Sequence, residues 1–152
     1  MDKTKVIDKL NEILRHEWTG VAQYSQAGFV VTGLWREVYS DLFFDSAKES
    51  FGHARLVGDK IVALGGVPTI ERNQVKQSND VVQLLEYGLE FETKAVQHYN
   101  DALALAEGDR ALVVFLEDIL KEEQEGVDHL SKLLRDQKAA TGSKSDAASK
   151  AG

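Results

Sequence analysis

The sequence predicts an all-α fold, a bundle of four long helices packed side by side, from three observations. Apolar residues recur at alternating spacings of three and four along four long segments, which is typical of helices that pack at a shallow angle. Only one of the 152 residues is a proline, and long helices avoid proline because it removes a backbone hydrogen bond. No segment alternates apolar and polar residues for long enough to require a strand.

We expect the first two helices at residues 3–31 and 36–64. The apolar stripe of the first consists of Leu10, Leu14, Val21, Tyr24 and Gly28. The second has a less regular stripe of Leu42, Val57, Ile61 and Leu64. Gly33 lies in the short turn between them, and the second helix is expected to stop at Gly65 and Gly66, shortly before Pro68. Glycine followed by proline is a typical helix end.

The other two helices are expected at residues 79–107 and 109–136. The stripe of the third consists of Leu85, Leu89, Val96, Tyr99 and Leu103, and that of the fourth of Leu112, Leu116, Ile119, Val127, Leu130 and Leu134. The turn Gly108-Asp109 joins them. The polar stretch that ends at Asp80 is long enough to cross from one end of a bundle to the other. We therefore expect two antiparallel hairpins joined by one long crossover.

The chain has the length of a single domain, which we assign to residues 1–137. Residues 138–152 form a low-complexity segment without a single bulky apolar side chain. Such a segment buries too little surface to offset its ordering entropy. We expect a disordered, flexible C-terminal tail there, or at best a frayed helical extension.

Composition excludes several kinds of chemistry and of partner. The chain has no cysteine, which excludes disulfides, zinc-thiolate sites, iron–sulfur clusters and thiol nucleophiles. No stretch is as apolar as a signal peptide or a membrane span. The net charge is −7, without a cluster of Lys and Arg, so neither nucleic acid nor membrane is expected as a partner. We expect a cytoplasmic protein.

Polar residues interrupt the apolar stripes. Glu17, Glu92 and Glu123 lie on the stripes of the first, third and fourth helices, and His53 precedes Val57 by four residues in the second. Counted from the turns, these positions and Ser50 lie roughly 15–19 residues away, and at ~1.5 Å per residue their heights differ by only a few ångströms. The polar positions therefore converge on one layer near the middle of the bundle.

Three carboxylates and an imidazole in an apolar layer are costly unless they are neutralised. Protonation of the carboxylates, or pairing of a charged His53 with one of them, would lower this cost. A divalent cation satisfies the groups best, because oxygen ligands with one imidazole suit iron, manganese or zinc. The alternative is a hydrogen-bonded polar layer that only fixes helix register. The coincidence of four positions favours metal binding.

Four segments resemble bacterioferritin, within the ferritin-like superfamily: LNEILRHEWTGVAQYSQAG, DSAKESFGHARLVGDKIVALGGVPT, LEFETKAVQHY and ILKEEQEGVDHLSKLL. The similarity covers residues 6–135. In such proteins the di-metal site takes one Glu from each of two helices and an E-x-x-H motif from each of the other two. The resemblance implies that Glu17 and Glu92 are the lone glutamates and that Tyr24 donates to a carboxylate.

Both E-x-x-H motifs differ from the family pattern. The first has Ser50 in place of its glutamate and keeps His53, whereas the second keeps Glu123 and has Gly126 in place of its histidine. The resemblance therefore implies the metal ligands Glu17, His53, Glu92 and Glu123. We expect one or two ions per chain, with iron favoured over manganese or zinc.

The altered motifs also affect the expected activity. Glu17, His53 and Glu123 form a two-carboxylate, one-histidine set that suits a single non-haem iron, while the second position keeps only Glu92 and a shared Glu123. Ferroxidase activity is therefore expected to be slow or absent. Glu49 and His129 lie within one helical turn of the lost ligands and offer substitutes. A solvated helix face is the alternative for both residues.

The resemblance bears on haem and assembly as well. The family's haem ligand, a methionine two residues before His53, is replaced by Phe51, and the only methionine is Met1. No haem is expected. Trp18 and Phe51 are candidates for a dimer contact or for packing within the bundle. We expect a homodimer or larger homo-oligomer, and whether a 24-subunit cage forms is left open because the tail differs from the family's short fifth helix.

Two functions follow. The first is a metal-binding, iron-binding protein that resembles a bacterioferritin subunit, with iron storage or ferrous oxidation at an altered di-iron centre. The second is a ferritin-like bundle without metal chemistry that acts as a structural or partner-binding protein.

Overall fold

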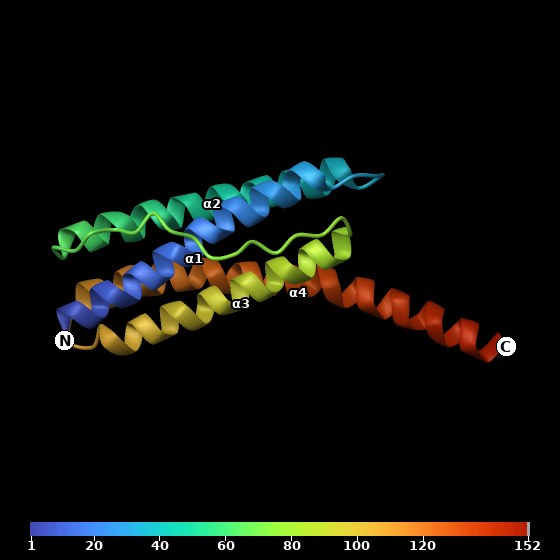
Figure 1. Ribbon diagram of the computed structural model, residues 1–152. Coiled ribbons are helices and arrows are strands. Elements are labelled where there is room, and N and C mark those ends of the chain that lie inside the picture. Colours follow the sequence, from blue (N-terminus) through green and yellow to red (C-terminus); the bar gives the residue numbers. More distant parts are fainter. Residues whose placement is uncertain (152) are drawn as a thin grey trace.

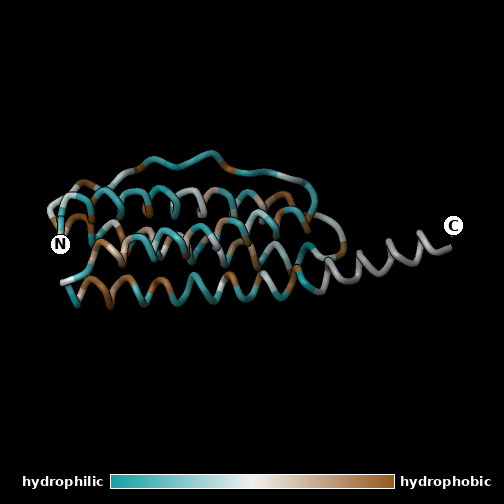
Figure 2. Tube along the Cα trace, turned by 90° about the horizontal axis from the view of Figure 1, so that it is seen from below, coloured by the Kyte–Doolittle hydropathy of each residue, from teal (hydrophilic) through white to brown (hydrophobic). Residues whose placement is uncertain are grey.

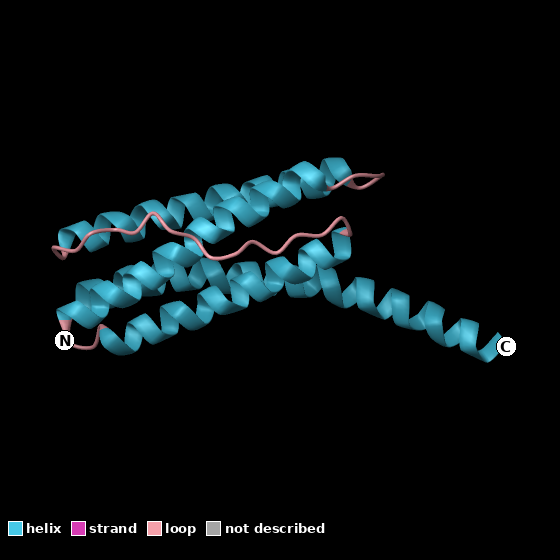
Figure 3. Ribbon diagram, viewed as in Figure 1, coloured by secondary structure: helices cyan, strands magenta, loops and turns pink. Residues whose placement is uncertain are grey.

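The protein is a bundle of four long helices. The computed structural model describes the backbone of residues 1–151 and the side chains of residues 1–135. The helices are α1 (Lys3–Val30), α2 (Arg36–Ala63), α3 (Val81–Leu105) and α4 (Arg110–Ala151) (Figure 1). Figure 3 shows only helices and loops over the described backbone. The predicted all-α four-helix bundle is confirmed.

The predicted helix ends agree with the structure to within two residues, except at the end of α4. The backbone of α4 is helical as far as Ala151. The predicted tail, residues 138–152, lies outside the residues whose side chains the structure describes. Across residues 1–151, no helix is both long and apolar enough to cross a membrane.

Glycines and aspartates define the helix ends. Gly33, Gly65 and Gly108 have positive φ angles of 92°, 88° and 98°, a conformation that glycine adopts without the steric cost of a Cβ atom. Asp2 and Asp80 cap α1 and α3, because their side chains accept hydrogen bonds from the backbone of the first turn. Because these glycines and aspartates can be recognised in the sequence, the helix ends could be predicted from it.

The chain connects the helices as two hairpins, α1–α2 and α3–α4. The segment between α2 and α3 runs along the bundle from one end to the other, as Figures 1 and 2 both show. Side chains of α1 hold this crossover in place: the Trp18 indole donates to the carbonyl of Thr69 at 3.0 Å, and Thr19 accepts from the backbone of Asn73 at 2.8 Å.

The core consists of two apolar clusters, one toward each end of the bundle. The first is built around Leu10, Leu14, Val57, Ile61, Tyr99 and Leu116. The second is built around Tyr24, Phe43, Leu85, Phe91, Leu130 and Leu134. On every helix the residues between the two clusters include a buried polar side chain. The bundle therefore contains a polar layer at mid-height.

Candidate metal centre

Each helix contributes one of the four predicted ligands to this polar layer. Glu17 is 0% exposed, His53 3%, Glu92 6% and Glu123 2%. Their helices position them because each lies on the apolar stripe that the helix turns toward its neighbours. All four side chains are thus withdrawn from water, as the periodicity predicts.

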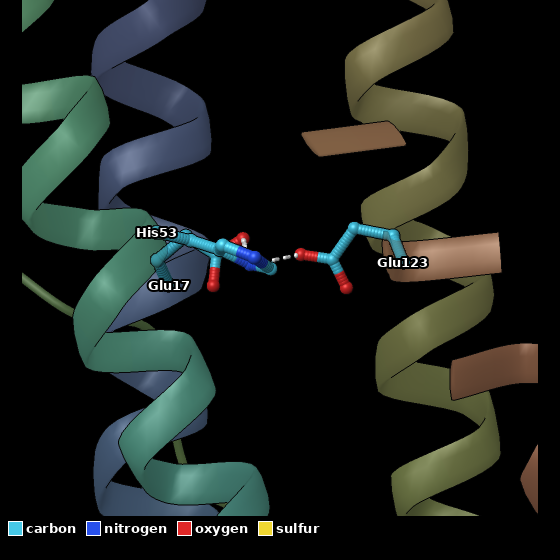
Figure 4. Close-up of side chains that lie close together, drawn as sticks. All are labelled: Glu17, His53 and Glu123. Carbon is cyan, nitrogen blue, oxygen red and sulfur yellow. Dashed lines mark hydrogen bonds and ion pairs between the residues drawn. The ribbon is translucent and has the colours of Figure 1, made fainter. Parts of the chain in front are cut away.

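Three of the four meet at one point. Potential ligand atoms of Glu17, His53 and Glu123 all lie within 4.8 Å of one another (Figure 4). Nδ1 of His53 is 2.9 Å from Oε1 of Glu123 and 3.8 Å from Oε1 of Glu17. Two carboxylates therefore face the same ring nitrogen.

The other ring nitrogen of His53 contacts a residue that the sequence did not indicate. Nε2 lies 2.6 Å from Oε2 of Glu122, whose side chain is 57% exposed. Histidines that bind a metal through one nitrogen commonly donate the other N–H to a carboxylate, which fixes the ring. Glu122 is placed to orient His53 in this way. Its position beside Glu123 gives no periodic signal, because it lies on the solvent-facing side of the helix.

Two tyrosines orient the lone glutamates. The Tyr24 hydroxyl on α1 donates to Oε1 of Glu92 on α3 at 2.7 Å. In the opposite direction, the Tyr99 hydroxyl on α3 donates to Oε1 of Glu17 on α1 at 3.1 Å. The contact of Tyr24 with a carboxylate agrees with the sequence prediction. Tyr99 was assigned only to the apolar stripe, although it follows Glu92 by the same seven residues that separate Tyr24 from Glu17.

The second oxygens of these glutamates lack partners. Oε2 of Glu17 and Oε2 of Glu92 are buried and accept no hydrogen bond from the described residues. Buried carboxylate oxygens without a donor are costly, and such atoms call for an explanation such as an ion. The donor set, two carboxylates and one imidazole, suits iron, manganese or zinc. The residues present therefore fit a divalent cation.

Electrostatics in the metal-free layer are strongly perturbed. Burial and the neighbouring Glu17 raise the pKa of Glu123 to about 7. Burial alone would lower the pKa of His53, but its hydrogen bonds and ion pairs with Glu123 and Glu17 raise it to about 12. Burial and Glu123 also raise the pKa of Glu92 well above its usual value. Both ring nitrogens of His53 lie within hydrogen-bond distance of carboxylate oxygens, an arrangement that suits a protonated ring when no ion is bound.

The two altered motif positions lie within the same layer. Ser50 is buried, and a Cβ atom on Gly20 would lie 2.5 Å from its hydroxyl. Gly126 lies beside Glu92: a Cβ atom there would be 3.3 Å from the carboxylate carbon of Glu92. Neither residue brings a carboxylate or an imidazole, so a second ion would find only Glu92 and the shared Glu123.

The residues considered as substitutes lie outside the group of three. Glu49 and His129 are exposed. Glu49 and His129 line a cavity of about 420 Å³ together with Glu92 and Gly126. No other group of three potential ligands within this distance is found among the described residues. In the structure Glu49 and His129 therefore lie beside the polar layer and are not part of the group of three.

Trp18 and Phe51 lie together on one side of the bundle. Their ring centroids are 6.1 Å apart, and Phe51 is 51% exposed. Both line a groove of about 300 Å³ that also includes Val62 and Ile70. The two rings are therefore in contact with each other, and an apolar groove remains open beside them.

Comparisons with known proteins agree with this architecture. Residues 7–140 match the family described as Ferritin-like domain. No curated protein matches the chain. Two solved structures are similar over nearly the whole length, each with a TM-score of 0.85.

One of these structures is a ferritin-like, diiron-carboxylate protein from Bacillus anthracis str. Ames, at 32% identity over 88% of this chain and 98% of that chain. The other is a dodecameric thioferritin, a bacterioferritin-related protein from Bacteroides fragilis, at 28% identity over 94% of this chain and 92% of that chain. With its four helices, its buried carboxylates and a family match that spans most of its length, the chain belongs to the ferritin-like superfamily.

Proposed function

We propose that this protein binds iron in the middle of its bundle, one ion held tightly by Glu17, His53 and Glu123. The observation that carries the proposal is the approach of these three ligands to within 4.8 Å in a buried layer. The unpartnered Oε2 of Glu17 supports it further. Manganese and zinc suit the same donors, and the diiron-carboxylate neighbour favours iron.

The side chains around the ligands hold them in position. Tyr99 occupies Oε1 of Glu17 and leaves Oε2 free. Glu122 holds Nε2 of His53, so that Nδ1 faces the two carboxylates. Iron bound there supplies the change between the ferrous and ferric states. The protein's part is to exclude water from the ion and to keep an imidazole and two carboxylates directed at it.

The second ion position of di-iron relatives is weak in this chain. It retains Glu92 and a share of Glu123, while Ser50 and Gly126 contribute no ligand. Fast oxidation of a ferrous pair depends on two ions held ~3.5–4 Å apart. We therefore propose iron binding and storage with slow ferrous oxidation at best.

Assembly belongs to the same proposal. The bacterioferritin-related neighbour is dodecameric, and the open groove at Trp18 and Phe51 offers an apolar contact. We propose that the chain forms a cytoplasmic homodimer or larger homo-oligomer through this groove. Phe51→Glu should then shift its elution in gel filtration toward the monomer, whereas Phe29→Glu, an exposed position in the last turn of α1, should not.

The alternative function is a bundle without metal chemistry. One observation favours it: Nδ1 of His53 lies 2.9 Å from Oε1 of Glu123 and 3.8 Å from Oε1 of Glu17, so that a protonated His53 can itself neutralise these carboxylates. A charged histidine in a hydrogen-bonded layer would fix helix register and require no ion. The two functions make different predictions for ferrous titration.

The test is an anaerobic ferrous titration followed by exposure to air. One tightly bound ion per chain, lost in Glu17→Gln and retained in Glu117→Gln, supports the proposed function. Glu117 is exposed on α4 and provides the matched change of charge. Absence of tight binding in the wild-type chain would establish the structural alternative instead. Two ions with rapid ferric absorbance would show an intact ferroxidase centre and contradict the single-ion proposal.

A further inference from the structure

A small cavity lies between α1, the crossover and α3, and residues of all three segments line it. Its volume is about 90 Å³, and none of the four predicted metal ligands is part of its wall. The crossover closes one side: the backbone N–H groups of Asn73 and Lys76 donate to the side chains of Thr19 and Gln23 on α1. We call this cavity the crossover pocket.

The most deeply buried polar group of the crossover pocket is the imidazole of His16, which is only 4% exposed. Its ring stacks on that of Phe91, with the centroids 4.0 Å apart and the planes at 10°. Nε2 lies 2.9 Å from the backbone oxygen of Phe91. Because a carbonyl oxygen only accepts, Nε2 carries a hydrogen and donates it. The other ring nitrogen, Nδ1, has no hydrogen-bond partner within residues 1–135.

Nδ1 of His16 is an acceptor. The ring forms no ion pair with a carboxylate in the described part of the chain, and the basic side chains Lys94 and His98 lie near it. These surroundings suit the neutral ring, in which one nitrogen donates and the other offers a lone pair. A buried acceptor without a donor costs free energy. A ligand that brings an O–H or N–H group is therefore stabilised at Nδ1.

The charged groups of the crossover pocket leave one positive charge without a partner. Lys76 on the crossover forms an ion pair with Glu90 on α3, whereas Lys94 forms neither an ion pair nor a hydrogen bond with the residues that the structure describes. A metal ion would meet this lysine, and among residues 1–135 a compact group of metal ligands is found only in the polar layer. The crossover pocket is therefore suited to an anion.

Side-chain amides add uncharged donors around the crossover pocket. Those of Asn73 and Gln74 line it and form no hydrogen bond with the described residues. The amide nitrogen of Gln23 has only a long contact, 3.5 Å, with the backbone oxygen of Tyr87. Each amide offers two N–H groups. The pocket thus combines one buried acceptor with several donors and one unpaired cation.

A protonated oxyanion matches this combination of groups. Its hydroxyl can donate to Nδ1 of His16, while its other oxygens accept from Lys94 and from the amides. Inorganic phosphate carries at least one hydrogen at neutral pH and so supplies both the donor and the negative charge. At ~30 Å³ per water molecule, the pocket has room for about three waters, which one small oxyanion can replace.

We propose that the crossover pocket binds one hydrogen phosphate ion, with its hydroxyl on Nδ1 of His16 and its charged oxygens facing Lys94. This inference goes beyond the proposed function and does not depend on it, because no predicted metal ligand lines the pocket. Since α1 belongs to one hairpin and α3 to the other, the bound ion also links the two hairpins.

Inorganic phosphate and sulfate are the two probes, titrated by calorimetry into the full chain after a chelator has removed metal ions. Phosphate should bind at one site per chain. Sulfate has the same shape and carries no hydrogen at neutral pH, so it cannot donate to Nδ1 and should bind at least tenfold more weakly. Equal affinities for the two ions would overturn the role of His16 and with it the proposal.

Lys94→Gln tests the positive charge and should weaken phosphate binding at least tenfold, because it removes the unpaired cation. Lys48→Gln is the matched control: Lys48 is exposed on α2 and is not among the residues that line the pocket. This control should bind phosphate as the wild-type chain does. A wild-type chain that does not bind phosphate, or a Lys94→Gln variant with unchanged affinity, would overturn the inference.

His16→Phe tests the acceptor, because it keeps a ring to stack on Phe91 and removes Nδ1. Phosphate binding should be lost while thermal unfolding shows an intact fold. If the variant does not fold, the comparison of phosphate with sulfate on the wild-type chain still decides the role of Nδ1. Glycerol phosphate that binds as tightly as phosphate would identify an ester as the ligand and contradict the assignment to the free ion.

Ferrous titration separates this inference from the proposed function. Lys94→Gln should retain the tight iron site of the wild-type chain and lose only phosphate. Conversely, Glu17→Gln should lose iron and retain phosphate. A wild-type chain that binds phosphate but no iron would leave the crossover pocket established and the proposed function refuted.

Discussion

Tyr99 and Glu17 are joined by a hydrogen bond across the bundle, from the phenol on α3 to Oε1 of the carboxylate on α1 at 3.1 Å. The pair Tyr24 and Glu92 makes the reciprocal contact. Each phenol occupies one oxygen of a lone glutamate, and in both glutamates the other oxygen has no partner. The tyrosines thus fix the orientation of both carboxylates.

Tyr99→Phe should weaken iron binding at the buried site by several-fold. The change removes the donor that orients Glu17 and leaves the shape of the core nearly unchanged. Because the acceptor is a buried carboxylate, we also expect a loss of about 1.5–3 kcal/mol in the free energy of unfolding. Anaerobic ferrous titration and urea denaturation measure the two effects.

The matched control for Tyr99→Phe is Tyr24→Phe, which removes the same group from Glu92. Glu92 is not in the group of three, so this variant should keep the affinity of the tight site. Equal losses in the two variants would show that the tyrosines act on the core as a whole and not on a particular ligand.

Ser50→Glu combined with Gly126→His should create a faster ferroxidase. The double change restores the glutamate of the first motif and the histidine of the second. The cavity beside Gly126 leaves room for an imidazole. We expect two irons per chain and initial oxidation at least about tenfold faster, because a paired site requires both ligands.

The single variants Ser50→Glu and Gly126→His each supply only one of the missing ligands, so we expect little increase in their rate of ferrous oxidation. Stopped-flow absorbance after mixing with air-saturated buffer compares the three variants with the wild-type chain. A single variant as fast as the double one would contradict the prediction, because it would show that one added ligand is enough to complete the second position.

Iron should raise the thermal stability of the protein. A ligand that binds only the folded state adds about 2.7 kcal/mol at a free concentration of 100 times Kd. For a chain of 152 residues this corresponds to an increase in Tm of roughly 5–10 °C. Anaerobic calorimetry with and without ferrous ion measures it. A chelator should reverse the increase, and Glu17→Gln should show none.

Gly20→Ala should destabilise the bundle at the level of the polar layer. The new Cβ atom would lie 2.5 Å from the Ser50 hydroxyl and closer still to the ring of Phe91. Overpacking of this kind costs about 1–3 kcal/mol. Gly52 is exposed on α2, and a Cβ atom there would have no heavy atom within 4 Å. Gly52→Ala is therefore the matched control. Gly52→Ala should stabilise the helix by up to about 1 kcal/mol. Urea denaturation measures the free energy of unfolding of both variants.

The fold could be predicted from the sequence because its signals are local. The turns contain glycines that have positive φ in the structure, at Gly33, Gly65 and Gly108. The stripes also place Glu17 and Glu92 at the right height, since the rise per residue of a helix is constant. These features do not depend on how the helices are rotated against one another.

The details of the site depend on that rotation and on rotamers. Periodicity places Glu92 in the layer, but it does not predict that the carboxylate accepts a hydrogen bond from Tyr24 or that it stays outside the group of three. The contact of Glu122 with His53 depends on the packing of α4 against α2. The sequence pattern assigns Tyr99 to the apolar stripe and does not predict the hydrogen bond from its hydroxyl to Glu17. Such pairings are properties of the assembled core.

The altered motifs leave an uneven division of ligands between the two hairpins. The α1–α2 hairpin keeps an imidazole and one carboxylate, and the α3–α4 hairpin keeps two carboxylates and no imidazole among the layer's buried residues. Neither hairpin on its own contains the whole group of three, which forms only when the two hairpins pack together. Occupancy by an ion would therefore report on the closure of the whole molecule, and any motion that parts the hairpins would release it.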